Sequence, residues 1–311
     1  MAEIIKYDEL KDYYQFLRLM DAAFSWAVTP ERIANIRRLD RRFAGPWGYG
    51  LMEGRELVGF VGVADIPARM RDGRTENIGG IHLVATLPGH GRQGIATRLL
   101  ERAHSYFRRK GYRFALLCSS RSLVAHSLYE RLGYADIESV YRTPQAYKIL
   151  ANKSKTQDPK PKNGDAAPAI DWNAIEQTFQ RCFRRWTGLA VRPSEWAAKR
   201  ASAMGLKPEN IVVVDGGYAI HGGGPDVLYV LEIAGRNRRV YLKLLKPLEA
   251  IGKPIMSDCY VRDPVLLRIY REQGYAFRWG NNAVVMCKPL TDTEFKPAFG
   301  NRFFFSTLDR F

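Results

Sequence analysis

A short glycine-containing loop carries the residues best suited to chemistry in this chain. Residues 81–87 form an apolar run that predicts a buried strand, and Pro88 and Gly89 predict a turn at its end. Gly91 and Gly94 follow, and a predicted helix begins at Gly94. Small residues let backbone N–H groups converge, and a helix N-terminus adds partial positive charge. This order of strand, loop and helix predicts a site for a phosphate-bearing ligand.

A second segment lies about thirty residues further along the chain. Residues 113–119 predict another buried strand, and residues 122–134 predict a helix. Ala125, Leu128 and Leu132 share one face of that helix because they lie three and four positions apart, and Gly133 is typical of a helix C-terminus.

Together the two segments resemble the GNAT acetyltransferase superfamily. The pyrophosphate motif of that superfamily, Arg/Gln-x-x-Gly-x-Gly/Ala, is similar to residues 91–96, Gly-Arg-Gln-Gly-Ile-Ala. Its later motif, Asn-x-x-Ala-x-x-Leu-Tyr-x-x-x-Gly-Phe/Tyr, is similar to residues 122–134. Gly91 and Ser122 depart from the usual Arg or Gln and the usual Asn. These departures change side-chain contacts to the cofactor and leave the backbone cradle intact.

The resemblance implies acetyl-CoA as co-substrate and no metal. The pyrophosphate would lie on backbone amides of the loop and helix start, and the pantetheine arm would lie where the strand splays from its neighbour. The cofactor-binding residues implied in this way are Val84, Ala85, Thr86, Gly91, Arg92, Gln93, Gly94, Ile95, Ala96, Thr97 and Ser122.

Acetyl transfer to an amine requires a group that protonates the leaving thiolate and a group that takes the amine proton. The resemblance implies Tyr129 as the acid; the alternative is a core tyrosine. The candidates for the base are the carboxylate of Phe311, His82, Glu76 and ordered water. A histidine on a strand is more often structural, and Glu76 could belong to a solvated ion pair.

Two tryptophans are candidates for the acceptor pocket. Two further helices are predicted, one over residues 10–24, with Phe24 on its apolar, core-facing stripe, and one that starts at Pro30. In the superfamily the first two helices flank the acceptor, and Trp26 and Trp47 lie near them in the sequence. The alternative for both is ordinary core packing.

The chain divides into four predicted parts. Residues 1–150 are expected to be a catalytic GNAT domain that ends in a strand near residues 146–150, residues 151–168 a basic, proline-containing linker, residues 169–290 a second unit, and residues 291–311 an aromatic tail. The predicted fold class is α/β, with two tandem GNAT-like mixed-sheet domains.

The second unit repeats part of the first. Residues 263–275 repeat the pattern of residues 122–134, and residues 211–219, 227–234 and 240–245 predict strands. No glycine-rich loop follows Val240, so this unit is expected to be degenerate, unable to hold pyrophosphate, with Tyr270 as a packing residue.

The pairing of an active and a degenerate domain resembles the Eis-like (enhanced intracellular survival) acetyltransferases without their sterol-carrier-like third domain. In that family a terminal aromatic carboxylate enters the active site, which implies the same for Phe311. Six phenylalanines among residues 291–311 are too many for a free terminus. The tail is therefore expected to cross back to the first domain; the alternative is a cap on the second domain's own sheet.

Composition narrows the possible functions. The net charge of +16 suits either nucleic acid or an anionic cofactor, but no run of five basic residues appears, which makes nucleic acid an unlikely partner. The sequence has no run of eighteen apolar residues and no signal-peptide pattern, and its four cysteines are widely spaced. These features predict a reduced, cytoplasmic protein with no membrane partner.

Two functions remain open at this point. The first is an acetyl-CoA-dependent N-acetyltransferase acting on a primary amine. The second is a non-catalytic module that senses coenzyme A or binds nucleic acid. The sequence leaves the acceptor and the oligomeric state undetermined.

Overall fold

The computed structural model describes residues 2–26, 28–137, 140, 144–150, 170–224, 226–258, 263–279 and 283–310. The first half of the chain contains β1 (Ala2–Lys6), α1 (Tyr13–Phe24), α2 (Pro30–Leu39), β2 (Gly48–Glu53), β3 (Glu56–Arg69), β4 (Thr75–Thr86), α3 (Ile95–Arg109), β5 (Phe114–Ser120), α4 (Val124–Arg131), β6 (Ala135–Asp136) and β7 (Pro144–Lys148). The second half contains α6 (Trp172–Phe183), β8 (Thr187–Gly188), α7 (Trp196–Ala203), β9 (Ile211–Val214), β10 (Gly217–Gly223), β11 (Leu228–Gly235), α8 (Arg238–Ala250), β12 (Ile255–Asp258), α9 (Pro264–Glu272), β13 (Ala276–Trp279), β14 (Ala283–Pro289), α10 (Phe295–Phe299) and β15 (Phe303–Phe304).

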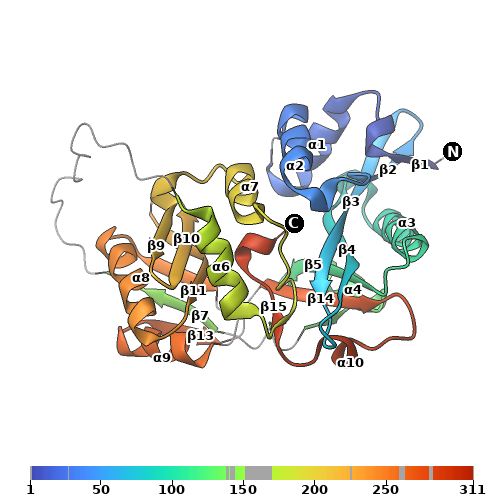
Figure 1. Cartoon of the computed structure of the whole chain (residues 1–311). Coiled ribbons are helices and arrows are strands. Elements are labelled where there is room, and N and C mark those ends of the chain that lie inside the picture. The colour runs from blue at the N-terminus through green and yellow to red at the C-terminus, as the bar shows by residue number, and fades with distance from the viewer. Residues whose placement is uncertain are drawn as a thin grey trace.

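These elements build two mixed sheets that lie side by side (Figure 1). The first has the order β1-β2-β3-β4-β5-β14-β6, with β8 joining β3 to β15; the second has the order β13-β7-β12-β11-β10-β9. Each sheet has one parallel pair near its centre, β4 with β5 and β11 with β12. The expected fold class, two tandem GNAT-like mixed-sheet units, is confirmed.

Each sheet contains a strand of four or more residues from the other half of the chain, and the first sheet also includes the two-residue strands β8 and β15. In Figure 1, green β7 lies among the orange strands of the second sheet, where it separates β12 from β13. Red β14 lies in the first sheet, between β5 and β6. The prediction that a strand near residues 146–150 completes the first sheet is therefore wrong, although the strand itself exists. We call this arrangement the strand exchange.

The side chains of the two strands are buried to different extents. Val284, Val285, Met286 and Cys287 are all buried, as a central strand covered on both faces requires. The residues of β7 alternate instead between buried and more accessible positions. The domain boundaries at residues 150 and 169 stay a prediction, since the predicted linker, residues 151–168, lies outside the described residues.

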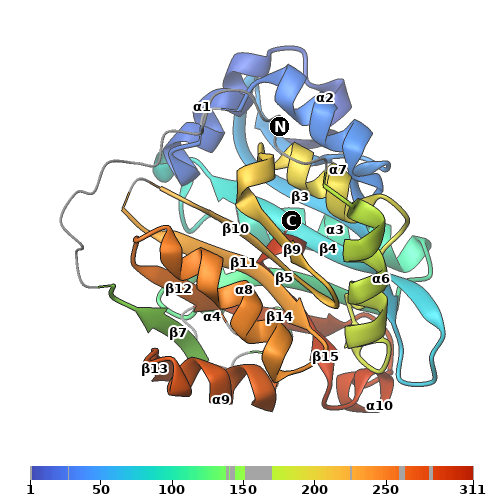
Figure 2. The ribbon, with the colours of Figure 1, turned by 60° about the vertical axis from the view of Figure 1, so that its left-hand side comes forward.

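Helices cover both faces of each sheet. In the first, α1 packs on the face that carries the core residues Phe60 and Leu116, and α3 packs on the other, with Leu99 and Phe107 fully buried. In the second, α8 and α9 share a core with β11 and β12 and lie in front of that sheet in Figure 2, while α6 packs on its other face against β10 and β11.

Two predicted elements of the second unit differ from the structure. Residues 240–245 lie inside helix α8, because Asn237 accepts a hydrogen bond from the Val240 amide and so caps the helix. Residues 211–219 form two strands, β9 and β10, because Asp215 and Gly216, with φ of 76° at the glycine, make a hairpin turn. With both changes, the order of helices and strands in the second unit is more similar to that in the first.

The aromatic tail packs against both halves of the chain, so the structure combines the predicted return to the first domain with the alternative, packing on the second unit. Phe299 packs against Phe114 of β5, with 5.1 Å between ring centroids, and β15 joins the first sheet through β8. Phe303, Phe304 and Phe305 are almost completely buried. None of the helices within the described ranges has the length and apolar composition needed to span a membrane.

Candidate active site

Strands β4 and β5 separate halfway along their length. Their pairing runs only from Gly79–Ala115 to Ile81–Leu117, although both strands continue toward Thr86 and Ser120. Just past the last pair, Leu83 has a φ of 50°, and the register between β3 and β4 shifts. A positive φ at a leucine is strained, and such strain clusters at functional sites. Val84, Ala85 and Thr86 lie on this diverging part of β4, where the sequence predicted them.

The loop after β4 presents an open helix N-terminus. Residues 91–94 are exposed, and Arg92 and Gly94 have φ of 62° and 77°. Gly94 is the N-cap of α3, no side chain caps that helix, and no acidic residue lies in its first turn. The amides at the start of α3 therefore remain available to an anion. Gln93 is in the exposed loop, and Ile95, Ala96 and Thr97 form the first turn of α3.

Ser122 lies before α4 rather than in it. Helix α4 begins at Val124, two residues later than predicted, and Ser122 is exposed in the preceding turn. Its hydroxyl lies 2.8 Å from that of Ser120, at the end of β5. The serine is thus next to the opening between β4 and β5.

Tyr129 projects from α4 into the core behind the first sheet. It is 6% exposed, and its ring contacts that of Tyr134 edge-on at 6.0 Å. Burial raises the pKa of Tyr129 to about 12. The phenol is therefore protonated at neutral pH, which is the form that can give a proton to a thiolate. Lys288 of β14 donates to the Leu132 carbonyl and so links the end of α4 to the exchanged strand.

The candidate bases differ in their surroundings. His82 is buried against Phe43 and Trp47, and burial lowers its pKa to about 4. Glu76 accepts two hydrogen bonds from Arg113, at 2.9 and 3.0 Å. Both therefore have the environment of structural residues. Phe311 lies outside the described residues.

The two tryptophans belong to the core on the α1 side of the sheet. Trp47 is 2% exposed, and its Nε1 is buried without a hydrogen-bond partner. Trp26 is half-buried and packs against the same core. Of the two, Trp26 is the one with surface that an acceptor could reach.

A cavity of about 260 Å³ lies at the end of β5. We call it the β5-end cavity, and it is lined by Cys118, Ser119, Ser120, Leu123, Val284, Val285, Phe305 and Arg310. Cys118 directly follows the last β4–β5 pair, so the cavity adjoins the opening. Sequence reasoning missed the lining residues from β14 and the tail, although the aromatic tail was the signal that could have found Phe305 and Arg310.

The corresponding place in the second sheet is closed. Strands β11 and β12 also pair over only three residues, ending at Val230 and Ser257. The cavity beyond that point measures only about 40 Å³, and Phe304, Phe305 and Ser306 of the tail form part of its wall. The helix that follows, α8, is capped by Asn237. Among the described residues, no group of His, Cys, Asp or Glu side chains is arranged to hold a metal in either half.

Comparison with known proteins agrees with this geometry. Residues 5–137 match the family model for the acetyltransferase (GNAT) domain. This part of the chain is therefore a GNAT acetyltransferase domain, of a fold that uses acetyl-CoA. A search of curated protein sequences found no match.

Solved structures extend the likeness to nearly the whole chain. A GCN5-related N-acetyltransferase from Kribbella flavida has a TM-score of 0.63 at 15% identity, over 93% of this chain and 72% of that one. Eis1 from Mycobacterium abscessus has a TM-score of 0.54 at 17% identity, over 93% and 74%. A tandem GNAT protein from the clavulanic acid biosynthesis pathway has a TM-score of 0.53 at 14% identity, over 94% and 100%. At these identities the likeness establishes the fold alone.

Proposed function

We propose that the protein is an acetyl-CoA-dependent N-acetyltransferase that moves the acetyl group to a primary amine. The observation that carries the proposal is the uncapped N-terminus of α3 beside the divergence of β4 and β5. The pyrophosphate would rest on the amides of residues 92–97, with Arg92 and Gln93 as added donors. The pantetheine arm would follow the free edge of β4 at Val84–Thr86, past Ser122.

Tyr129 is the proposed general acid. The thioester carbonyl gains negative charge as the amine attacks, and amides of the diverging strand would stabilise that charge. The C–S bond then breaks, and the Tyr129 hydroxyl gives its proton to the leaving thiolate. Burial keeps the phenol protonated at neutral pH, so a proton is available. The same burial makes Tyr129 a weaker acid than free tyrosine, so this role depends on the hydroxyl reaching the leaving sulfur and not on its acidity.

The amine would enter through the β5-end cavity. Its proton goes to solvent at the mouth, since His82 and Glu76 are already engaged in the core and in an ion pair. Because a lysine-like amine has a pKa near 10.4, turnover should rise with pH through the neutral range. Holding the two reactants together would supply the remaining acceleration.

A thiol-release assay with acetyl-CoA tests the proposal. The acceptors are a lysine-containing peptide, spermidine and kanamycin, and calorimetry with coenzyme A runs in parallel. Amine-dependent thiol release and one coenzyme A site per chain are expected. Tight binding of one coenzyme A without release to any amine would instead support the second candidate, a non-catalytic module that senses coenzyme A.

A further inference from the structure

The tail segment from Phe303 to Arg310, which we call the tail hook, is buried between the two halves of the chain. Phe303, Phe304 and Leu308 are at most 1% exposed, and Asp309 is 2% exposed. Phe304 packs against Phe183 of α6, with ring centroids 4.4 Å apart. The hook thus occupies the place in the second sheet that corresponds to the opening between β4 and β5.

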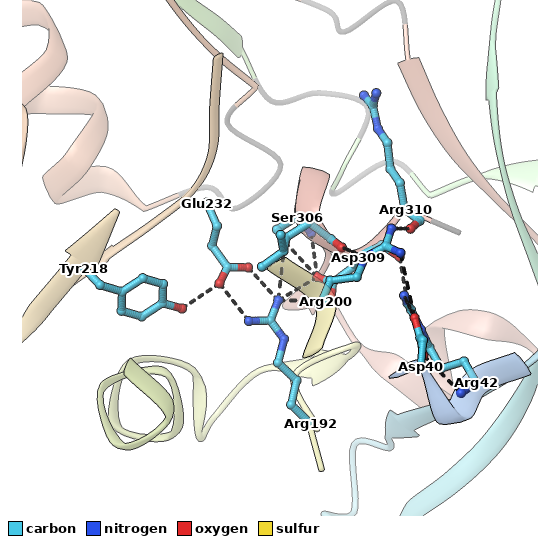
Figure 3. A network of polar contacts seen from close by, with 10 residues as sticks. Asp40, Arg42, Arg192, Arg200, Tyr218, Glu232, Ser306, Asp309 and Arg310 are labelled. Carbon is cyan, nitrogen blue, oxygen red and sulfur yellow. Dashed lines mark hydrogen bonds and ion pairs between the residues drawn. The ribbon is translucent and has the colours of Figure 1, made fainter. Parts of the chain in front are cut away.

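Three arginines hold the hook by its backbone and by one carboxylate (Figure 3). Arg42, from the first half, donates to the Asp309 carbonyl at 2.8 Å. Arg200, from α7, donates to the Leu308 carbonyl at 2.9 Å and also to the Arg310 carbonyl. Arg192 donates to both carboxylate oxygens of Asp309, at 3.0 and 3.1 Å. Backbone carbonyls are fixed points of the chain, so these contacts set the position of the hook itself.

The second unit in turn fixes Arg192. Glu232 accepts from Arg192 at 2.7 and 2.5 Å, and Tyr218 donates to the same carboxylate at 2.6 Å. The Arg192 guanidinium also lies between the rings of Phe179 and Trp196, 3.9 and 4.0 Å from their centroids. Such planar, doubly hydrogen-bonded groups are pre-organised, which suits them to hold another segment in one geometry.

The charges of the arginines persist at neutral pH. Burial opposes ionisation of Arg192, but Asp309 and Glu232 raise its pKa above the usual value. Burial and the nearby Arg42 lower the pKa of Arg200 to about 10, so it still carries its charge at pH 7. Both side chains therefore keep every donor that the hook requires.

The end of the hook forms part of the β5-end cavity, through Phe305 and Arg310. We infer that Arg192 and Arg200 are positioning residues for acetyl transfer: the degenerate unit holds the hook as a wall of the acceptor cavity of the first domain. This inference rests on the proposed function. It gives the second unit a role that is incompatible with cofactor binding in that unit. The hook and a pantetheine arm would compete for the same opening, the one between β11 and β12.

The test compares Arg200→Met with Arg238→Met. Methionine keeps the apolar stem of Arg200 but removes its donors to Leu308 and Arg310. Arg238 is a matched control, since it forms an ion pair with Glu272 on the exposed side of α8, away from the hook. Ser306→Ala is a milder variant, because it removes only a hydroxyl that lies 2.9 Å from the Asp309 carboxylate. Arg200→Lys restores the charge with fewer donors.

Two measurements distinguish positioning from a purely structural role. Amide hydrogen exchange of residues 303–310 should speed up about tenfold in Arg200→Met, and less in Ser306→Ala. With the best acceptor among the lysine peptide, spermidine and kanamycin, kcat/KM for the amine should fall about 10- to 100-fold while coenzyme A affinity is kept. Arg200→Lys should recover part of that loss, and Arg238→Met should match the unmodified protein.

Other outcomes would overturn the inference. Faster exchange in the hook with unchanged amine kinetics would show that the hook does not shape the acceptor cavity. A parallel loss of coenzyme A affinity and thermal stability, in Arg200→Met and in Ser306→Ala, would show a structural role only. If the unmodified protein transferred no acetyl group to any amine, the proposed function would fail first and this inference with it.

Discussion

The two openings between diverging strands, one in each sheet, differ in what occupies them. In the first sheet the strands part beside an uncapped helix N-terminus, and a cavity of about 260 Å³ remains. In the second sheet the same divergence is filled by the tail hook, and only about 40 Å³ remains. The connection to the following helix also shortens, from residues 87–94 before α3 to Arg236 and Asn237 before α8.

The comparison shows how one fold can serve two purposes. Both sheets contain an opening of the same kind, because in each the central parallel pair is short and its strands then separate. Whether that opening binds a ligand depends on a loop of a few residues and on what else the chain places there. In the second unit a capped helix has lost its anion site, and the opening holds part of the chain instead.

The strand exchange should make the two halves inseparable. Val284, Val285 and Met286 each contribute about 1.5–3 kcal/mol by burial, and the three contributions together are comparable to the whole stability of a domain. Residues 1–160 produced alone should therefore fail to fold. The same fragment co-expressed with tagged residues 161–311 should co-purify with it and regain native circular dichroism. A stable isolated fragment that binds coenzyme A would contradict the exchange.

Substitution of Gly94 should abolish cofactor binding. Gly94→Val places a branched side chain where the backbone must approach the pyrophosphate. We expect the affinity for coenzyme A, measured by calorimetry, to fall by about 100-fold or more. Gly252→Val is the matched control: Gly252 has the same φ of 77° and the same open surroundings, but lies after α8. Equal affinity losses in both variants would indicate backbone strain rather than a cradle.

The tyrosines of α4 and α9 should respond differently to loss of their hydroxyls. Tyr129→Phe should lower kcat about 10²- to 10⁴-fold with little change in KM for acetyl-CoA, because the thiolate forms only during reaction. Tyr270→Phe should keep kcat and cost about 1 kcal/mol of unfolding free energy, since Tyr270 lies 3.1 Å from Ser257 within the core. A normal kcat in Tyr129→Phe would show that this tyrosine is structural.

Acid should destabilise the protein through its buried histidines. Burial lowers the pKa of His104 to about 3. Below pH 6.5 this histidine is therefore protonated in the unfolded chain but remains neutral in the folded chain. Stability from this group is complete above pH 6.5 and is lost as the pH falls toward 3. His104→Gln should therefore shrink the loss of unfolding free energy between pH 7 and 4.5 by roughly 2–3 kcal/mol.

Chemical denaturation at both pH values measures this effect. His221→Gln in the second sheet is the comparison variant, because burial lowers the pKa of His221 as well, while a hydrogen bond with the Glu209 backbone opposes that shift. An identical pH dependence in His104→Gln and in the unmodified protein would refute the assignment.

Local patterns in the sequence predicted the parts of the site that lie close together along the chain. The loop at Gly91 and Gly94 and the helix that carries Tyr129 were visible because glycine spacing and helical periodicity are local signals. Phe24, expected in the core, is 45% exposed because α1 buries Phe16, Leu19 and Met20 instead. The spacing of apolar residues in α1 was compatible with burial of either face of the helix.

The strand exchange could not be predicted in the same way. Strands β7 and β14 each follow a GNAT-like unit at the expected place in the sequence. The residue pattern within each strand does not indicate which of the two sheets it joins. The β5-end cavity depends on the same long-range pairing, because Val284 and Val285 reach it only through β14. Residues 240–245 were predicted as a strand because the spacing of their apolar residues fits both a strand and a helix. In the structure the Asn237 cap favours the helix.

The strand exchange also determines when the first sheet can be completed during synthesis on the ribosome. Strand β5 is complete at Ser120, but its partner β14 begins only at Ala283, about 160 residues later. At typical elongation rates the edge of β5 waits roughly 8–30 s for its partner. During that interval β7 is the first strand of more than two residues that could pair with the vacant edge, so the native pairing requires that a local partner be passed over for a distant one. We therefore expect the speed of translation across residues 150–283 to affect the yield of native protein.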